Sequence, residues 1–151
     1  MKRLIMALLM STLLLGGCIN NKNNEDNQSE DDITDNIHEE EIMKLEIDEH
    51  VLDVSWNNNA SVTALNEIKP LTINIHLYGG FEQVGSIGQS IVSDDKEITT
   101  KPGDVVLYSS NQIVVFFGTN TWSYTKLGHI NLSDSELNTL LNKSNVTLKI
   151  Y

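Results

Sequence analysis

The chain has 151 residues, with 21 acidic and 10 basic side chains and a formal net charge of −11. This charge excludes a nucleic-acid-binding protein that neutralises phosphates with a broad basic surface. The single cysteine, Cys18, excludes an intramolecular disulfide and a cysteine-rich zinc site. The length suits about one domain.

The first 18 residues have the features of an export signal. Lys2 and Arg3 precede a mainly apolar run over residues 4–15, which is shorter than the roughly 20 residues of a spanning helix. Leu15-Gly16-Gly17-Cys18 resembles the lipobox of bacterial lipoproteins, which implies that residues 1–17 are removed and that Cys18 receives a diacylglycerol. Two or more acyl chains hold a protein stably on a membrane, so we expect a lipid-anchored protein on the extracytoplasmic face of the cell membrane. The alternative is an ordinary signal peptide, or a cysteine that follows an apolar run by chance.

The segment after this cysteine is rich in acidic and amide side chains. Residues 19–42 hold nine Asp and Glu residues against one lysine. Such a segment buries too little apolar surface to offset the entropy lost on ordering. We therefore predict that residues 18–42, which begin with the lipidated cysteine, form a disordered linker. The alternative is a metal site in the His-Glu-Glu-Glu run at residues 38–41, but contiguous residues rarely surround one ion without a structured loop.

Alternating apolar and polar residues predict that residues 43–151 form one β-rich domain. Residues 43–47 and 50–56 are predicted to pair as a hairpin. Residues 61–69 carry apolar side chains three positions apart before Pro70, which indicates a short helix. Residues 71–77 alternate strictly and predict a strand, after which Gly79 and Gly80 are expected to turn the chain at positive φ.

The rest of the domain is predicted to be short strands separated by turns. Residues 82–103 are mostly loop-like, with weak strand signals at 91–92 and 97–100. Strands are expected at 105–108, 112–117, 121–124, 128–131 and 146–151, and the capping box that begins at Ser133 predicts a second helix. Many short strands with two short helices favour a closed barrel, with an open sandwich as an equal alternative on periodicity alone.

Three stretches in this domain resemble the small bacterial cyclophilin-like domains. They are residues 61–78, the Lys-Pro-Gly-Asp-Val-Val-Leu-Tyr segment at 101–108, and residues 113–118 with 122–130. The resemblance implies a closed antiparallel eight-stranded barrel with two short helices over residues 43–151. The chain departs from the family pattern at Phe117, where Tyr is usual, and at Lys126 and His129, where Arg is often found.

The same resemblance raises the question of prolyl isomerisation. Eukaryotic-type cyclophilins use an arginine, whose planar fork lysine does not reproduce, whereas the only arginine here is Arg3 in the signal segment. We therefore predict a non-catalytic module without cofactor or metal and with no catalytic residue. The alternative is a divergent peptidyl-prolyl isomerase in which Lys126 or His129 is a weak substitute donor. The four histidines occur singly, at no metal-site or triad spacing (His38, His50, His76 and His129).

Aromatic residues around the predicted pocket of the barrel indicate binding. The candidate ligand-binding residues are Tyr78, Phe81, Phe117, Trp122, Tyr124, Lys126 and His129. Core packing is the alternative for each aromatic residue, and Phe116 and Phe117 are expected to point in opposite directions. Trp122 is the best candidate for an exposed platform. We predict a monomer that binds a peptide or a small apolar ligand, has no nucleic-acid partner and contacts the membrane through the lipid on Cys18.

Overall fold

The computed structural model describes residues 42–151. The predicted signal peptide, the predicted lipidation site Cys18 and all of the predicted linker except its last residue lie outside this range. Within it, no helix is long and apolar enough to cross a membrane.

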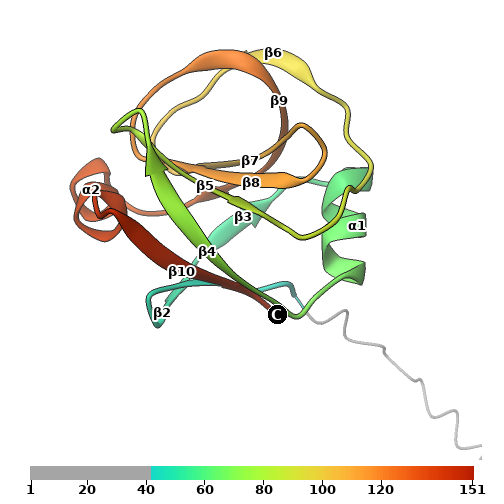
Figure 1. Cartoon of the computed structure of the whole chain (residues 1–151), viewed down its shortest axis with the longest axis horizontal. Helices are drawn as coiled ribbons and strands as arrows, with labels where there is room; N and C mark the ends of the chain where they lie inside the picture. The colour runs from blue at the N-terminus through green and yellow to red at the C-terminus, as the bar shows by residue number, and fades with distance from the viewer. Residues whose placement is uncertain (1–41) are drawn as a thin grey trace, which may run out of the picture. The chain divides into compact units, whose positions relative to one another are not determined.

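Ten strands and two helices make up the described part of the chain (Figure 1). In chain order they are β1 (Leu45–Ile47), β2 (His50–Leu52), β3 (Val54–Trp56), α1 (Ala60–Glu67), β4 (Leu71–Tyr78), β5 (Glu82–Ser86), β6 (Lys96–Thr99), β7 (Asp104–Tyr108), β8 (Gln112–Phe116), β9 (Thr121–Ile130), α2 (Asp134–Leu141) and β10 (Asn145–Ile150).

The strands form a nearly closed antiparallel barrel. Along the sheet the order is β2-β1-β10-β4-β5-β8-β7-β9-β3, and β6 pairs separately with β9. Only Asp53 separates β2, which pairs with β1, from β3, which pairs with β9, so this bent segment brings the two ends of the sheet together. The predicted mainly-β barrel with two short helices is thereby confirmed. The order along the sheet contains nine strands instead of the expected eight. The reason is that Asp53 divides residues 50–56, which were predicted as one strand, into β2 and β3.

The two ends of the domain lie beside each other. The backbone amide of Lys44 donates to the carbonyl of Tyr151 at 2.7 Å, and the Tyr151 amide donates to the Lys44 carbonyl at 3.1 Å. The last strand, β10, pairs with β1 on one side and with β4 on the other. Ile150 is opposite Leu71, so β4 begins at this end of the barrel and runs away from it towards Tyr78.

Both helices begin at side-chain caps. The Asn59 side chain accepts a hydrogen bond from the Val62 amide at the start of α1. The capping box predicted for the second helix is present, because Ser133 and Glu136 each bond the backbone amide of the other. In the barrel core, α1 buries Leu65, and α2 buries Leu137, Leu140 and Leu141.

Buried side chains form two separate clusters on opposite faces of the sheet. The larger fills the barrel and includes Val105, Leu107, Ile113, Val115 and Phe117. The smaller consists of residues that alternate with these on β7, β8 and β9, namely Val106, Val114, Phe116 and Tyr124. Phe116 and Phe117 thus point to opposite faces as predicted, and β8 is buried on both. The smaller cluster makes the outer face of these strands apolar, which is unusual for a wall that would otherwise contact water.

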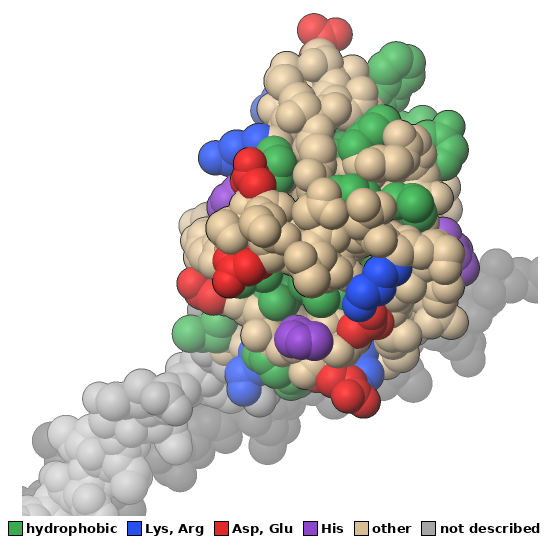
Figure 2. All heavy atoms as spheres, turned by 90° about the vertical axis from the view of Figure 1, so that its left-hand side faces the viewer, with side chains coloured by type: hydrophobic (Ala, Val, Ile, Leu, Met, Phe, Trp, Pro, Cys, Tyr) green, Lys and Arg blue, Asp and Glu red, His purple; other side chains and the backbone are tan. Residues whose placement is uncertain are grey.

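Charged side chains of both signs are spread over the surface. On the face drawn in Figure 2, Asp, Glu, Lys and His side chains are interspersed, and hydrophobic side chains gather near one side. No broad basic area is visible on this face, in keeping with the excess of acidic residues.

Candidate functional site

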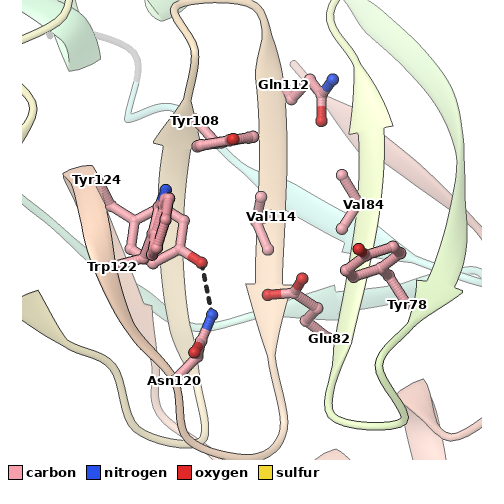
Figure 3. A pocket seen from close by; sticks show the side chains of 9 residues that line it. All are labelled: Tyr78, Glu82, Val84, Tyr108, Gln112, Val114, Asn120, Trp122 and Tyr124. Carbon is pink, nitrogen blue, oxygen red and sulfur yellow. Dashed lines mark hydrogen bonds between the residues drawn. The ribbon is translucent and has the colours of Figure 1, made fainter.

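A cavity of about 440 Å³ lies on the outer face of the barrel, against the smaller cluster. This volume is in the range of small-molecule sites. Strands β4, β5, β7, β8 and β9 supply most of its wall (Figure 3). The lining residues are Tyr78, Glu82, Val84, Tyr108, Gln112, Val114, Asn120, Trp122 and Tyr124.

The strand register explains why these side chains converge. Tyr78 is opposite Glu82, Val84 is opposite Val114, and Tyr108 is opposite Gln112. Residues that are directly opposite in an antiparallel pair point to the same face, so the pairs form a continuous surface across β4, β5, β8 and β7. The hairpin between β4 and β5 turns through Gly79 and Gly80, at φ values of 61° and 79°, as the sequence predicted.

Aromatic rings form opposite sides of the cavity. Figure 3 shows Trp122 and Tyr124 on one side, Tyr78 on the other and Tyr108 between them. Tyr108 and Phe116 each contact Tyr124 edge-on, with ring centroids 5.8 Å and 5.6 Å away. Tyr124 is buried, whereas Tyr78 and Trp122 are 68% and 58% exposed and form the rim. The predicted exposure of Trp122 is confirmed.

Two amide side chains add polar groups to this apolar surface. Asn120 donates a hydrogen bond from Nδ2 to the Tyr124 hydroxyl oxygen at 2.9 Å. The hydroxyl proton of Tyr124 is therefore free to be donated to another acceptor. The Gln112 amide lies at the far end of the cavity from Asn120 (Figure 3).

Within the described part of the chain, Glu82 is the one charged residue that lines the cavity. Its side chain extends from β5 into the cavity (Figure 3), although the residue is only 5% exposed. Its Oε2 atom has no hydrogen-bond partner among residues 42–151. Burial raises the pKa of this carboxyl to about 7. Burial also raises the pKa of Tyr124, and the negative charge of Glu82 raises it further, while the Asn120 hydrogen bond opposes both effects.

Three of the predicted binding residues line this cavity: Tyr78, Trp122 and Tyr124. The other two aromatic residues do not. Phe81 stacks on Phe116 with ring centroids 6.4 Å apart and packs against the smaller cluster. Phe117 points into the barrel core and packs there, so the alternative of core packing holds for this residue.

The two basic candidates, Lys126 and His129, meet at a different carboxylate. Asp104 Oδ1 lies 3.0 Å from Lys126 Nζ and 2.8 Å from His129 Nδ1. Asp104 is only 2% exposed, and its Oδ2 also accepts from the Lys101 amide. Neither Lys126 nor His129 lines the cavity. The cluster joins β7 to β9, since Asp104 and His129 are directly opposite in the ladder.

The most informative residue of the cavity, Glu82, was not predicted. It lies in a segment of polar residues and glycine that was expected to be a loop, so no alternation of apolar residues marked it as a strand. The segment is a strand, β5, because it pairs with β4 and β8. The buried side chain of Gln83 also fastens it to the end of α2, where it donates to the carbonyls of Leu141 and Lys143. Asn120 and Gln112 likewise carried no sequence signal.

The described residues can be considered as possible metal ligands. Among the residues that the structure describes, no three His, Cys, Asp or Glu side chains are grouped as metal ligands would be. In the cavity, Glu82 is accompanied only by phenols, amides, an indole and valines.

The fold and the cavity together define a small antiparallel barrel with a ligand-sized recess on its outer wall. The model of the cyclophilin-like family matches residues 45–151, and the chain belongs to this family. The family resemblance predicted from the three sequence stretches is thus confirmed for the domain. No curated protein matches the chain.

Proposed function

We propose that this protein is a lipid-anchored extracytoplasmic lipoprotein whose cyclophilin-like barrel binds a peptide or small ligand without catalysing a reaction. The cavity on the outer wall carries the proposal, because it combines four aromatic rings with a buried carboxyl whose Oε2 atom has no partner among residues 42–151. Aromatic surface supplies contact area, and a few polar groups fix the orientation of a ligand. The lipobox-like residues 15–18 support the anchor.

We propose that the domain does not catalyse prolyl isomerisation because of the hydrogen-bond donors that it offers. Isomerisation twists a bond whose barrier is roughly 18–20 kcal/mol, and the arginine that cyclophilins use has no counterpart after Arg3 in this sequence. The alternative isomerase would use Lys126 or His129, and both side chains are engaged by Asp104 outside the cavity lining. Fold alone does not carry an activity.

Ligand screening tests the binding role. A peptide library and a small-molecule library are screened against the wild-type domain and Trp122→Ala, with Tyr151→Ala as a control for an exposed aromatic residue elsewhere. We expect ligands whose binding weakens in Trp122→Ala alone. Ligands that bind all three proteins equally would contradict this site.

A prolyl isomerase assay on a proline-containing peptide tests the non-catalytic role. We expect no acceleration over the uncatalysed rate. Acceleration that Tyr124→Ala or Trp122→Ala abolishes would show that the cavity is an active site.

Replacement of Cys18 tests the anchor. We expect the full chain to be found in the membrane fraction of the producing bacterium, and Cys18→Ala to be released from it. Equal membrane association of the two proteins, or a wild-type protein without acyl chains by mass spectrometry, would contradict lipidation.

A further inference from the structure

The charge in the cavity is of one sign. Of the described residues that line it, Glu82 is the only ionisable one apart from three tyrosines (Tyr78, Tyr108 and Tyr124). Its carboxyl is nine-tenths buried, points into the cavity, and leaves Oε2 without a partner in the described residues. An ionised carboxyl in an apolar setting is costly unless a donor or a positive charge compensates it. Among the described residues, no lysine, arginine or histidine lines the cavity to offer this compensation, and a cationic ligand would supply it.

The rings around this carboxyl are suited to the same kind of ligand. Trp122 and Tyr124 lie on one side of the cavity and Tyr78 on the opposite side (Figure 3). The faces of Trp and Tyr rings attract a cation within about 6 Å of the ring centroid. Several such rings beside one carboxylate are a common arrangement for binding an organic ammonium group.

The charge of the whole domain acts in the same direction. Residues 43–151 contain twelve acidic residues and seven lysines. The resulting field attracts cations and repels anions. A phosphate or carboxylate ligand would meet no cation in the cavity lining, and this argues against an anionic ligand.

Resting on the proposed binding role of this cavity, we infer that its ligand carries an organic ammonium group, which lies between the aromatic rings and forms an ion pair with Glu82. The group could belong to a small quaternary amine or to a lysine side chain of a peptide. Its positive charge completes the site in both cases.

The pH dependence of binding separates this inference from its main competitor. A neutral ligand with a carbonyl group would accept a hydrogen bond from protonated Glu82 and bind more weakly as the pH rises. An ammonium ligand needs ionised Glu82 and binds more tightly as the pH rises. The other titratable groups that line the cavity with Glu82 are Tyr78 on β4, Tyr108 on β7 and Tyr124 on β9, and burial raises the pKa of Tyr124. Burial raises the pKa of Glu82 to about 7, so its carboxyl governs the range between about pH 6 and 8.

Two pairs of probes of matched shape test the inference. Choline is compared with the neutral 3,3-dimethylbutan-1-ol, and N-acetyl-lysine amide with N-acetyl-norleucine amide, by NMR titration of the Trp122 indole signal. At least one cation should bind about tenfold more tightly than its neutral counterpart, a difference expected for a partly desolvated cation–π and ion-pair contact. Which pair shows the difference identifies a small amine or a peptide as the source. Affinity for that cation should rise between about pH 5.5 and 8.

Variants assign the effect to the carboxyl. Glu82→Gln keeps the shape of the side chain and should remove the preference for the cation, while Glu97→Gln removes the same charge from an exposed site outside the cavity and should retain it. Equal affinity for both members of each pair, tighter binding at low pH, or no shift by any probe would overturn the ammonium inference. Other ligands that depend on Trp122 would still support the proposed binding function.

Discussion

Glu82 carries a carboxyl whose ionised form is disfavoured by burial. Its pKa is raised from 4.5 in the unfolded chain to about 7 in the folded domain. Between these values the folded domain holds a proton that the unfolded chain has lost, so ionisation of Glu82 destabilises the fold as the pH rises. The effect is complete above about pH 7 and absent below about pH 4.5.

We predict that Glu82→Gln changes the pH dependence of stability. The free energy of unfolding of the wild type should fall relative to the variant from about pH 4.5 to 7, by on the order of 2–3 kcal/mol, and then level off. Urea denaturation at a series of pH values measures the difference. A gap between wild type and variant that is constant with pH would show that the Glu82 carboxyl is not perturbed.

Asp104 is also buried, and three donors surround its side chain. We predict that Asp104→Asn lowers the free energy of unfolding by about 1–3 kcal/mol, since charge-assisted hydrogen bonds between β7 and β9 are lost. Asp94→Asn is the control: Asp94 pairs with Lys96 at 2.7 Å, both side chains are exposed, and such pairs contribute about 0–1 kcal/mol. Equal effects of the two changes would mean that Asp104 has no special structural role.

At the scale of elements, the sequence predicted the strands whose apolar residues alternate or form a run. Residues 71–77, 105–108 and 112–117 became β4, β7 and β8 within a residue or two, and the weak signal at 97–100 became β6. Strands without that periodicity were either not predicted, as for β5, or predicted in two parts, as for β9. The two short strands expected at 121–124 and 128–131 are the single β9, whose register shifts at a bulge opposite Val105 and Val106. The weak strand signal at 91–92 was wrong.

The cavity was predicted only in part for the same reason. Tyr78, Trp122 and Tyr124 are aromatic, and residue type alone made them candidates. Glu82 and Gln112 enter the site through strand register, because β5 pairs with β8, which is distant in the sequence. Asn120 precedes β9 and enters the site through its hydrogen bond to Tyr124. Lys126 and His129 were candidates by family position, and the register directs them to Asp104 instead.

Gly85 on β5 lies close to β4 because glycine has no side chain. A Cβ atom at Gly85 would lie 2.5 Å from Ile75 Cγ2 and 3.0 Å from the Asn74 carbonyl oxygen. We predict that Gly85→Ala lowers the free energy of unfolding by about 1–3 kcal/mol, because buried Ile75 must shift. Urea denaturation measures this loss, with Ser86→Ala at the exposed end of the same strand as the control. A stable Gly85→Ala domain would mean that β4 and β5 can separate freely at this point.

At the scale of the molecule, closure of the barrel depends on β10. Its side chains Val146, Leu148 and Ile150 are buried, and each contributes roughly 1.5–3 kcal/mol. Their sum is comparable with the whole stability of a typical domain, about 5–15 kcal/mol. We predict that deletion of residues 145–151 abolishes cooperative unfolding, measured by tryptophan fluorescence in urea, whereas Tyr151→Ala retains it. A truncated domain that still unfolds cooperatively would contradict this role of β10.

Because β10 fills the gap between the first strand and the fourth, the wall of the cylinder stays open until residues 145–150 have been made. No earlier segment occupies that gap, and its pairings join positions about a hundred residues apart, which is a slow kind of contact to make. A newly made chain therefore keeps an open wall until β10 has been synthesised. For the export that we propose, this delay would let the chain pass through a narrow channel before the barrel closes.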